Sequence, residues 1–187
     1  VISTRTCDLF KEINEIKAIS KRTLMEKPGF NSIEELMSLK SIDHEIYIGL
    51  QRRFSPLTAI YEDLINKSKE EINSISLRVK SNCKLWHPYQ FTKDFYALNS
   101  NMGGGVLKTE CHELISTFLF FENLELTNTN KYRKFDDSDV FTDLELNALI
   151  DNVELSADLS ISSEELERSI SVKTNSSIFE FDYISNS

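Results

Sequence analysis

The sequence predicts an α+β fold that is predominantly helical. Residues 1–134 should form a body of three or four helices, and residues 135–187 should form an acidic segment that contains short β-strands. Two patterns predict this division: apolar residues recur at helical spacing in much of the chain before residue 121, whereas strict alternation appears only near the end. An all-α bundle with an extended tail is the alternative. We expect the acidic segment to pack on the body as part of one domain.

The first two predicted helices cover residues 6–24 and 31–50. Apolar side chains share one face of the first, which ends before Pro28 because proline cannot continue a helix. The second begins with a capping-box pattern, Ser32 followed by Glu35. It is apolar on more than one side, and this predicts a central position.

The third and fourth predicted helices cover residues 57–79 and 107–121. Ser55-Pro56 supplies an N-cap and a proline at the first helical position. At 1.5 Å per residue the third helix would be roughly 35 Å long. The glycine cluster Gly103-Gly104-Gly105 predicts a bend before the fourth helix.

The acidic segment carries the clearest strand pattern in the chain. Apolar residues alternate with Glu, Ser and Asp over residues 153–162, and aromatic residues alternate with acidic ones over 179–183. Before these strands, Thr142 and Glu145 could cap a short helix that runs through Leu149.

The net charge of −9 is concentrated at one end of the chain. Residues 1–134 hold 19 basic and 17 acidic side chains, whereas residues 135–187 hold 2 and 13. This balance argues against nucleic acid and anionic membranes as direct partners, because both attract clustered Lys and Arg. No apolar run is long enough for a membrane span.

The three cysteines, Cys7, Cys83 and Cys111, are an odd number at wide spacing. Such a pattern favours a reducing compartment, so we expect the cytoplasm or the nucleus. The chain begins at Val1, which suggests trimming or processing, and secretion after removal of a signal peptide stays open.

Cys111 is the main candidate for a nucleophile. It lies shortly after the glycine bend, near a predicted helix N-terminus that would lower a thiol pKa, and His87 could supply a base. The competing interpretation is a small buried apolar side chain on the helix face of Leu114 and Phe118. Gly103 to Thr109 also invites comparison with a phosphate-binding loop, but Met102 and Leu107 stand where that motif requires glycine.

A metal site is not expected. Cys83, His87, Cys111 and His112 are the potential ligands, but adjacent helical residues point about 100° apart, so Cys111 and His112 cannot easily face one ion. No cofactor is expected either.

Aromatic and aliphatic residues in two segments are the candidates for a partner-binding surface. Trp and Tyr concentrate binding energy, and an aromatic-x-x-aliphatic motif can add a strand to a partner's sheet. The candidate residues are Trp86, Tyr89, Phe91, Phe181, Tyr183 and Ile184.

By elimination, the sequence predicts a non-catalytic protein–protein interaction module or a subunit of a larger complex. The acidic segment or the aromatic region 86–96 would bind another protein, for which a basic surface would be complementary. The alternative is a cysteine-dependent or phosphate-binding enzyme centred on Gly103 to His112.

Overall fold

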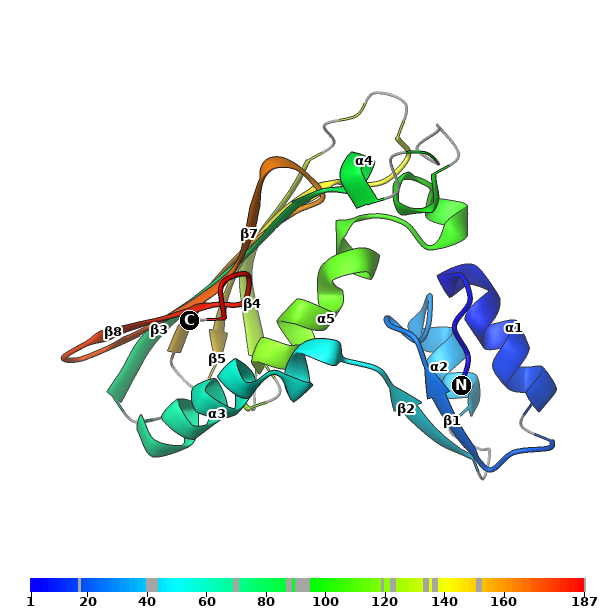
Figure 1. The fold of residues 1–187 in the computed structure, drawn as a ribbon, viewed down its shortest axis with the longest axis horizontal. Coiled ribbons are helices and arrows are strands. Elements are labelled where there is room, and N and C mark those ends of the chain that lie inside the picture. Colours follow the sequence, from blue (N-terminus) through cyan, green and yellow to red (C-terminus); the bar gives the residue numbers. More distant parts are fainter. Residues whose placement is uncertain are drawn as a thin grey trace.

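The computed structural model forms a small unit with parallel strands and a larger unit built on a mixed sheet, with helix α5 between them (Figure 1). The structure describes residues 1–187 except 17, 40–43, 69–70, 87–88, 90–94, 119, 122–123, 133–134, 136–137, 151–152 and 187.

The small unit alternates strands and helices. Its elements are α1 (Thr6–Ile16), β1 (Arg22–Met25), α2 (Ile33–Leu39) and β2 (Glu45–Ile48). β1 pairs with β2 in parallel, and Ile2 forms a parallel bridge with Met25 on the other side. Its core consists of Ile2, Leu9, Ile13, Met25 and Leu39, which are all buried. Parallel strands joined through helices are the arrangement of doubly wound α/β folds.

The larger unit is a six-stranded sheet with helices. Its helices are η1 (Gln51–Phe54), α3 (Pro56–Ser68), α4 (Cys83–Trp86), η3 (Tyr96–Leu98), η4 (Ser100–Met102) and α5 (Val106–Phe118). Its strands are β3 (Ile72–Asn82), β4 (Leu124–Tyr132), β5 (Asp143–Ile150), β6 (Val153–Ser160), β7 (Ser162–Thr174) and β8 (Ile178–Asp182). They lie in the order β4-β5-β6-β3-β7-β8, and only the β3–β6 pair is parallel.

The main core lies between this sheet and the helices α3 and α5, which lie on the same side of it in Figure 1. Alternate residues of the central strands point into it, including Leu77, Leu155 and Ile170. The intervening residues of β3 are polar, and Lys80 lies 3.3 Å from Asp158 on the neighbouring strand β6. The sheet therefore buries one face under helices and carries charged side chains on the other.

The glycine bend places the N-terminus of α5 close to η3. A Cβ atom on Gly104 would lie 2.3 Å from the carbonyl oxygen of Tyr96, so only glycine fits there. Gly103 and Gly105 have φ values of 79° and 100°, in the region that favours glycine. The amide of Val106 donates to the carbonyl oxygen of Phe141 in the segment before β5. These contacts hold the first turn of α5 against the sheet unit.

The prediction of a predominantly helical fold is wrong, and so is the alternative of an all-α bundle. The third predicted helix covers a helix and part of a strand in the structure, because α3 ends at Ser68 and β3 begins at Ile72. Ile72, Ile75 and Val79 continue the helical spacing of α3, but Ile75, Leu77 and Val79 also alternate as in a strand, and all are buried. The alternation decides the structure because β3 lies between two strands that supply its hydrogen bonds.

Three other predicted helices also need correction. The patterns over residues 6–24 and 31–50 each ran through a helix into β1 or β2, four-residue strands that are too short to show a period of two. The short helix predicted after Thr142 is the strand β5. By contrast, α5 and the strands β6 and β8 lie where the sequence predicts a helix and two strands.

Among the described helices, none combines the length and the apolar character that crossing a membrane requires.

Candidate functional site

Lys27 lies at the carboxyl end of a parallel strand, where open α/β sheets bind their ligands. It follows β1 directly after Glu26 and precedes Pro28, to which it is joined by a cis peptide bond. Its Nζ atom donates a hydrogen bond to the carbonyl oxygen of Thr109, at 2.5 Å. Thr109 lies in the first turns of α5, so this bond connects the small unit to the larger one.

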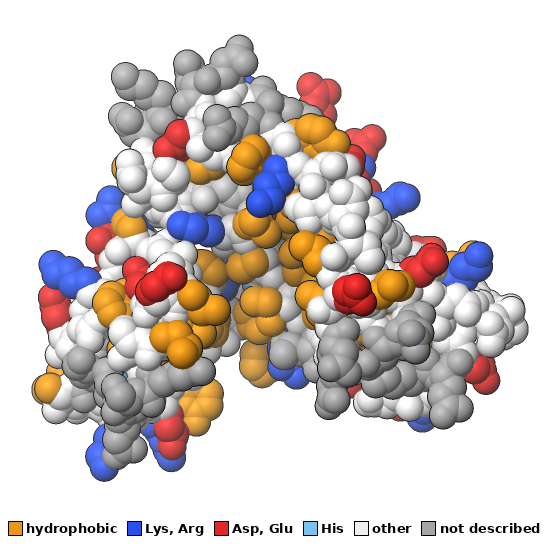
Figure 2. Space-filling model, turned by 180° about the vertical axis from the view of Figure 1, so that it is seen from behind, with side chains coloured by type: hydrophobic (Ala, Val, Ile, Leu, Met, Phe, Trp, Pro, Cys, Tyr) orange, Lys and Arg blue, Asp and Glu red, His pale blue; other side chains and the backbone are white. Residues whose placement is uncertain are grey.

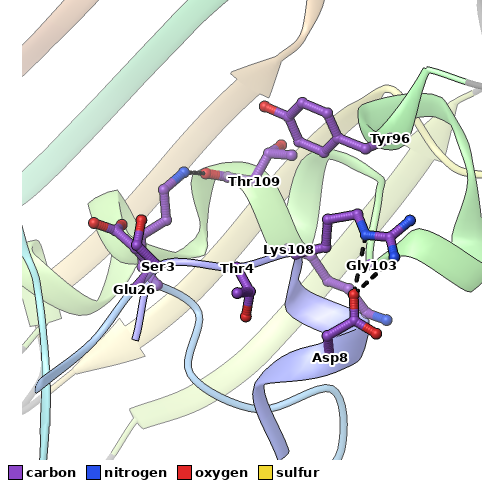
Figure 3. Close-up of a pocket in the computed structure, with 10 residues that line it drawn as sticks. Ser3, Thr4, Asp8, Glu26, Tyr96, Gly103, Lys108 and Thr109 are labelled. Atoms are coloured by element: carbon purple, nitrogen blue, oxygen red, sulfur yellow. Dashed lines mark hydrogen bonds and ion pairs between the residues drawn. The ribbon is translucent and has the colours of Figure 1, made fainter. Parts of the chain in front are cut away.

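A cavity of about 780 Å³ surrounds this contact. Its walls come from the start of the chain, the segment after β1, the η3 helix and the N-terminus of α5, and its lining residues are Ser3, Thr4, Arg5, Asp8, Glu26, Lys27, Tyr96, Gly103, Lys108 and Thr109. Figure 3 shows Ser3, Thr4 and Asp8 on one side and Tyr96 and Thr109 on the other. Seen from behind, the boundary between the two units is hollowed, and hydrophobic side chains gather there (Figure 2).

Several side chains in the cavity can bind the hydroxyl groups of a ligand. Ser3 and Thr4 are exposed hydroxyl side chains. Burial, together with the nearby charge of Glu110, raises the pKa of Tyr96, so its phenol stays neutral and can donate as well as accept hydrogen bonds. Lys27 adds an ammonium donor beside them.

A buried cluster of charged residues lies one turn further along α5. The Nε atom of Arg52 lies 2.7 Å from Oε2 of Glu113, and both side chains are buried. Arg52 also donates to the carbonyl oxygen of Glu113 and to the hydroxyl of Thr117, each at 2.7 Å. Arg168 and His112 approach the other carboxylate oxygen of Glu113, at 3.4 Å and 3.3 Å. The cluster joins η1, α5 and β7.

The two carboxylates of this cluster have opposite pKa shifts. Burial raises the pKa of Glu110, and its interactions with His112, Lys27 and Arg168 offset this only in part. Burial also disfavours ionisation of Glu113, but His112, Arg52 and Arg168 outweigh it and hold its pKa below the usual range. Glu113 is therefore the charged partner of the arginines.

One set of potential metal ligands lies in the same cluster. Oxygen and nitrogen atoms of Glu110, His112 and Glu113 all lie within 4.8 Å of one another. However, Arg52 and Arg168 already bring two positive charges to these carboxylates, at 2.7 Å to 3.9 Å. A further cation would be repelled by both guanidinium groups, so we interpret the set as an ion-pair network.

The environment of the predicted nucleophile does not activate it. Cys111 is half-buried, and burial raises the pKa of its thiol, although Lys27 acts in the opposite direction. Its sulfur lies 3.9 Å from the carbonyl oxygen of Lys108, in the same helix. A raised pKa keeps the less reactive thiol form at neutral pH. His87, the predicted base, lies outside the described residues.

The predicted partner-binding residues lie in different environments. Tyr89 and Ile184 are exposed, whereas Trp86 is half-buried against the main core. Phe181 is only 6% exposed and belongs to the core. Tyr183 packs under Arg52, whose guanidinium carbon lies 5.0 Å from the ring centre. Phe91 lies outside the described residues.

Sequence reasoning missed Lys27 altogether. It treated Pro28 as the end of a helix, whereas a strand ends just before Glu26. In β1, Thr23 and Met25 are buried and Arg22 and Leu24 are exposed, a pattern that the residue types do not reveal, so the sequence carried no clear signal for this strand. Lys108 and Thr109 were considered only within an incomplete phosphate-binding motif.

No protein-family model and no curated protein sequence matches the chain. Solved structures do match it over nearly its whole length. An NAD-binding protein from Listeria innocua has 16% identity and a TM-score of 0.81, with 100% of this chain and 53% of that chain covered. A myo-inositol dehydrogenase from Corynebacterium glutamicum has 14% identity and a TM-score of 0.76, with 97% and 55% covered. An aldose-aldose oxidoreductase from Caulobacter crescentus has 14% identity and a TM-score of 0.80, with 96% and 55% covered.

The fold is shared with oxidoreductases. The chain spans about half the length of these solved structures. This similarity overturns the expectation of a helical, non-catalytic interaction module or complex subunit. That expectation rested on a helical body with charge segregated into an acidic C-terminal segment, but β3, within residues 1–134, is a strand that pairs with β6 and β7 of the acidic segment.

Proposed function

We propose that this chain forms the substrate-binding part of an oxidoreductase that acts on a hydroxyl group of a sugar or polyol. The observation that carries the proposal is the position of Lys27, at the carboxyl end of β1 and in hydrogen-bond contact with α5 inside a polar cavity. The similar solved structures support the substrate class, because two of them are a myo-inositol dehydrogenase and an aldose-aldose oxidoreductase.

In this proposal Lys27 binds and orients the substrate. Its ammonium group has three donors, and the structure records one of them in use, toward Thr109. The remaining donors can bind substrate hydroxyl oxygens, and Tyr96 and Ser3 can bind neighbouring hydroxyls. Holding several hydroxyls at once fixes which carbon of the substrate reacts.

NAD is the ligand that the description of the Listeria protein names, and the residues of this chain do not match what its pyrophosphate requires. Its pyrophosphate needs a glycine-rich turn between a strand and a helix. The turn before α1 holds Ser3, Thr4 and Arg5 without glycine, and the turn before α2 holds only Gly29. The Gly-x-Gly-x-x-Gly pattern is absent from the sequence. The residues present do not fit the pyrophosphate, so no step is assigned to the cofactor.

Amide chemical shifts of the isotope-labelled chain, measured while myo-inositol is added, test the proposal. We expect shift changes that saturate and that gather on Ser3, Lys27, Tyr96 and Thr109, which line the cavity. Lys80 and Asp158, on the other face of the sheet, serve as internal controls and should not shift. Changes confined to that face, or no saturable change at millimolar inositol, would contradict the proposal.

We further propose a reducing compartment, the cytoplasm or the nucleus. The support is that Cys7, Cys83 and Cys111 are all free thiols. Imaging of the fluorescently tagged protein in its own cells tests this, and a secreted product would contradict it.

A further inference from the structure

We infer that the substrate carries a negatively charged group, a carboxylate or a phosphate, and that Lys108 selects for it. The inference rests on the proposed function, because it concerns the ligand of the same cavity. It is carried by the charges of the cavity, by the hydrogen bonds that those charges already make, and by the position of Lys108.

The cavity has an excess of positive charge. Arg5 and Asp8 form an ion pair at 2.9 Å and compensate each other. Lys27 donates to the carbonyl oxygen of Thr109, and Lys108 donates to Oδ1 of Asn31 at 3.1 Å, so both ammonium groups bind neutral oxygens. Within the described part of the chain, neither of these lysines has a carboxylate within ion-pair distance.

This local excess contrasts with the chain as a whole, whose net charge is −9. Glu26 is the remaining acidic residue that lines the cavity, and it carries one negative charge against the two positive charges of Lys27 and Lys108. Among the residues that line the cavity, a neutral polyol would leave one positive charge unpaired. The buried Glu110 also acts on Lys27, but burial raises the pKa of Glu110 and so disfavours its negative charge. A substrate with one negative group would balance the unpaired positive charge, and charge-assisted hydrogen bonds are stronger than neutral ones.

Side chains, rather than backbone amides, must hold the negative group. The amides of Gly104, Gly105 and Val106 at the start of α5 already donate to the carbonyl oxygens of Asn99, Ala97 and Phe141. The helix N-terminus therefore cannot cradle an anion as a phosphate-binding loop does. The recorded hydrogen bond of Lys108 uses one of its three donors, which leaves two for a ligand.

Lys108 also lines a second cavity of about 260 Å³, to which Lys131 contributes. The second cavity also contains the carboxylate of Asp139, which accepts a hydrogen bond from the amide of Ser100 and offsets the charge of Lys131. Lys108 lines both cavities, so we place the negative group beside Lys108, on the side of the first cavity. Lys27 remains near the hydroxyl groups of the substrate, next to Thr109.

Calorimetric titration with three ligands tests the inference. They are myo-inositol, which is neutral, glucuronate, which carries a carboxylate, and glucose 6-phosphate, which carries a phosphate. We expect one or both anions to bind the chain about tenfold more tightly than inositol, and the stronger of them identifies the group. Lys108→Met should remove that preference, so that the anions bind no more tightly than inositol, whereas Lys108→Arg should keep it. Added salt should reduce the preference.

The outcomes separate this inference from the proposed function. Two results overturn the inference: equal binding of the three ligands by the unmodified chain, or an equal loss of affinity for all three in Lys108→Met. In both cases, binding of inositol to the unmodified chain still upholds the proposed function. Failure of all three ligands to bind overturns both.

Discussion

Arg52 and Glu113 form a buried ion pair, with 2.7 Å between Nε and Oε2. Arg52 belongs to η1, the first element after the small unit, and Glu113 belongs to α5, whose first turns line the cavity. The pair thus fixes the helix that carries Lys108 and Thr109 to the segment that connects the two units. A buried pair of this kind is costly to break, because the remaining partner keeps an uncompensated charge.

We predict that Arg52→Met lowers the free energy of unfolding by about 3 to 5 kcal/mol, because Glu113 would remain buried without its main partner. Urea denaturation measures the change. The double variant Arg52→Met/Glu113→Leu should recover much of the loss, since it leaves no unpaired charge from this pair. As a matched control, Lys67→Met breaks an exposed pair with Asp63 and should cost less than about 1 kcal/mol. Equal effects of the two single variants would show that burial of the Arg52–Glu113 pair does not change its contribution to the free energy of unfolding.

The raised pKa of Glu110 predicts that Glu110→Gln increases the stability of the fold by an amount that depends on pH. A carboxyl whose pKa is higher in the folded than in the unfolded chain destabilises the fold once pH exceeds the unfolded value of about 4.3. Glu110→Gln should therefore stabilise the chain at neutral pH, and the gain should disappear as pH falls below that value. Thermal unfolding across this pH range is the measurement. A gain that persists unchanged at the lowest pH would contradict the assignment.

Gly104→Ala should destabilise the chain by about 1 to 3 kcal/mol, the usual range for an overpacked site. The new Cβ atom would lie 2.3 Å from the carbonyl oxygen of Tyr96, so η3 or the start of α5 must shift. Gly49→Ala is the control, because the nearest atom to its Cβ lies at 3.6 Å. Chemical denaturation of both variants provides the comparison, and similar stabilities would mean that the bend tolerates a side chain.

Alkylation rates test whether Cys111 is an activated nucleophile. Burial raises its pKa, so at neutral pH it should react with iodoacetamide more slowly than a free model thiol. Cys83 is fully buried and has a pKa raised to about 11, so it should react more slowly than Cys111. Mass spectrometry of the modified peptides gives the rates. A fast reaction confined to Cys111 would restore the candidate nucleophile.

The sequence predicted the elements whose pattern is long and unambiguous. The alternation that begins at Val153 continues through β6, and the helix after the glycine bend is α5. β3 was misjudged because Ile75 and Val79 satisfy a helical spacing and a strand spacing at once, and only the neighbouring strands decide between them.

The candidate site could not be predicted in the same way, because it depends on contacts between distant segments. Lys27 and Thr109 are 82 residues apart, and their hydrogen bond exists only once the small unit meets α5. β1 has four residues, which is too few to show a period. The sequence correctly predicts a helix after the glycine bend. It suggests phosphate as a ligand of this segment, whereas in the structure the start of the helix contacts Lys27 in the segment after β1.

We propose that the cavity around Lys27 binds hydroxylated substrates. Calorimetric titration of myo-inositol into the chain, Lys27→Met and the exposed control Lys67→Met tests it most directly. We predict saturable binding that Lys27→Met weakens about tenfold, through loss of one charged hydrogen bond, and that Lys67→Met leaves unchanged. Equal affinity of Lys27→Met and the unmodified chain would show that Lys27 does not bind the ligand.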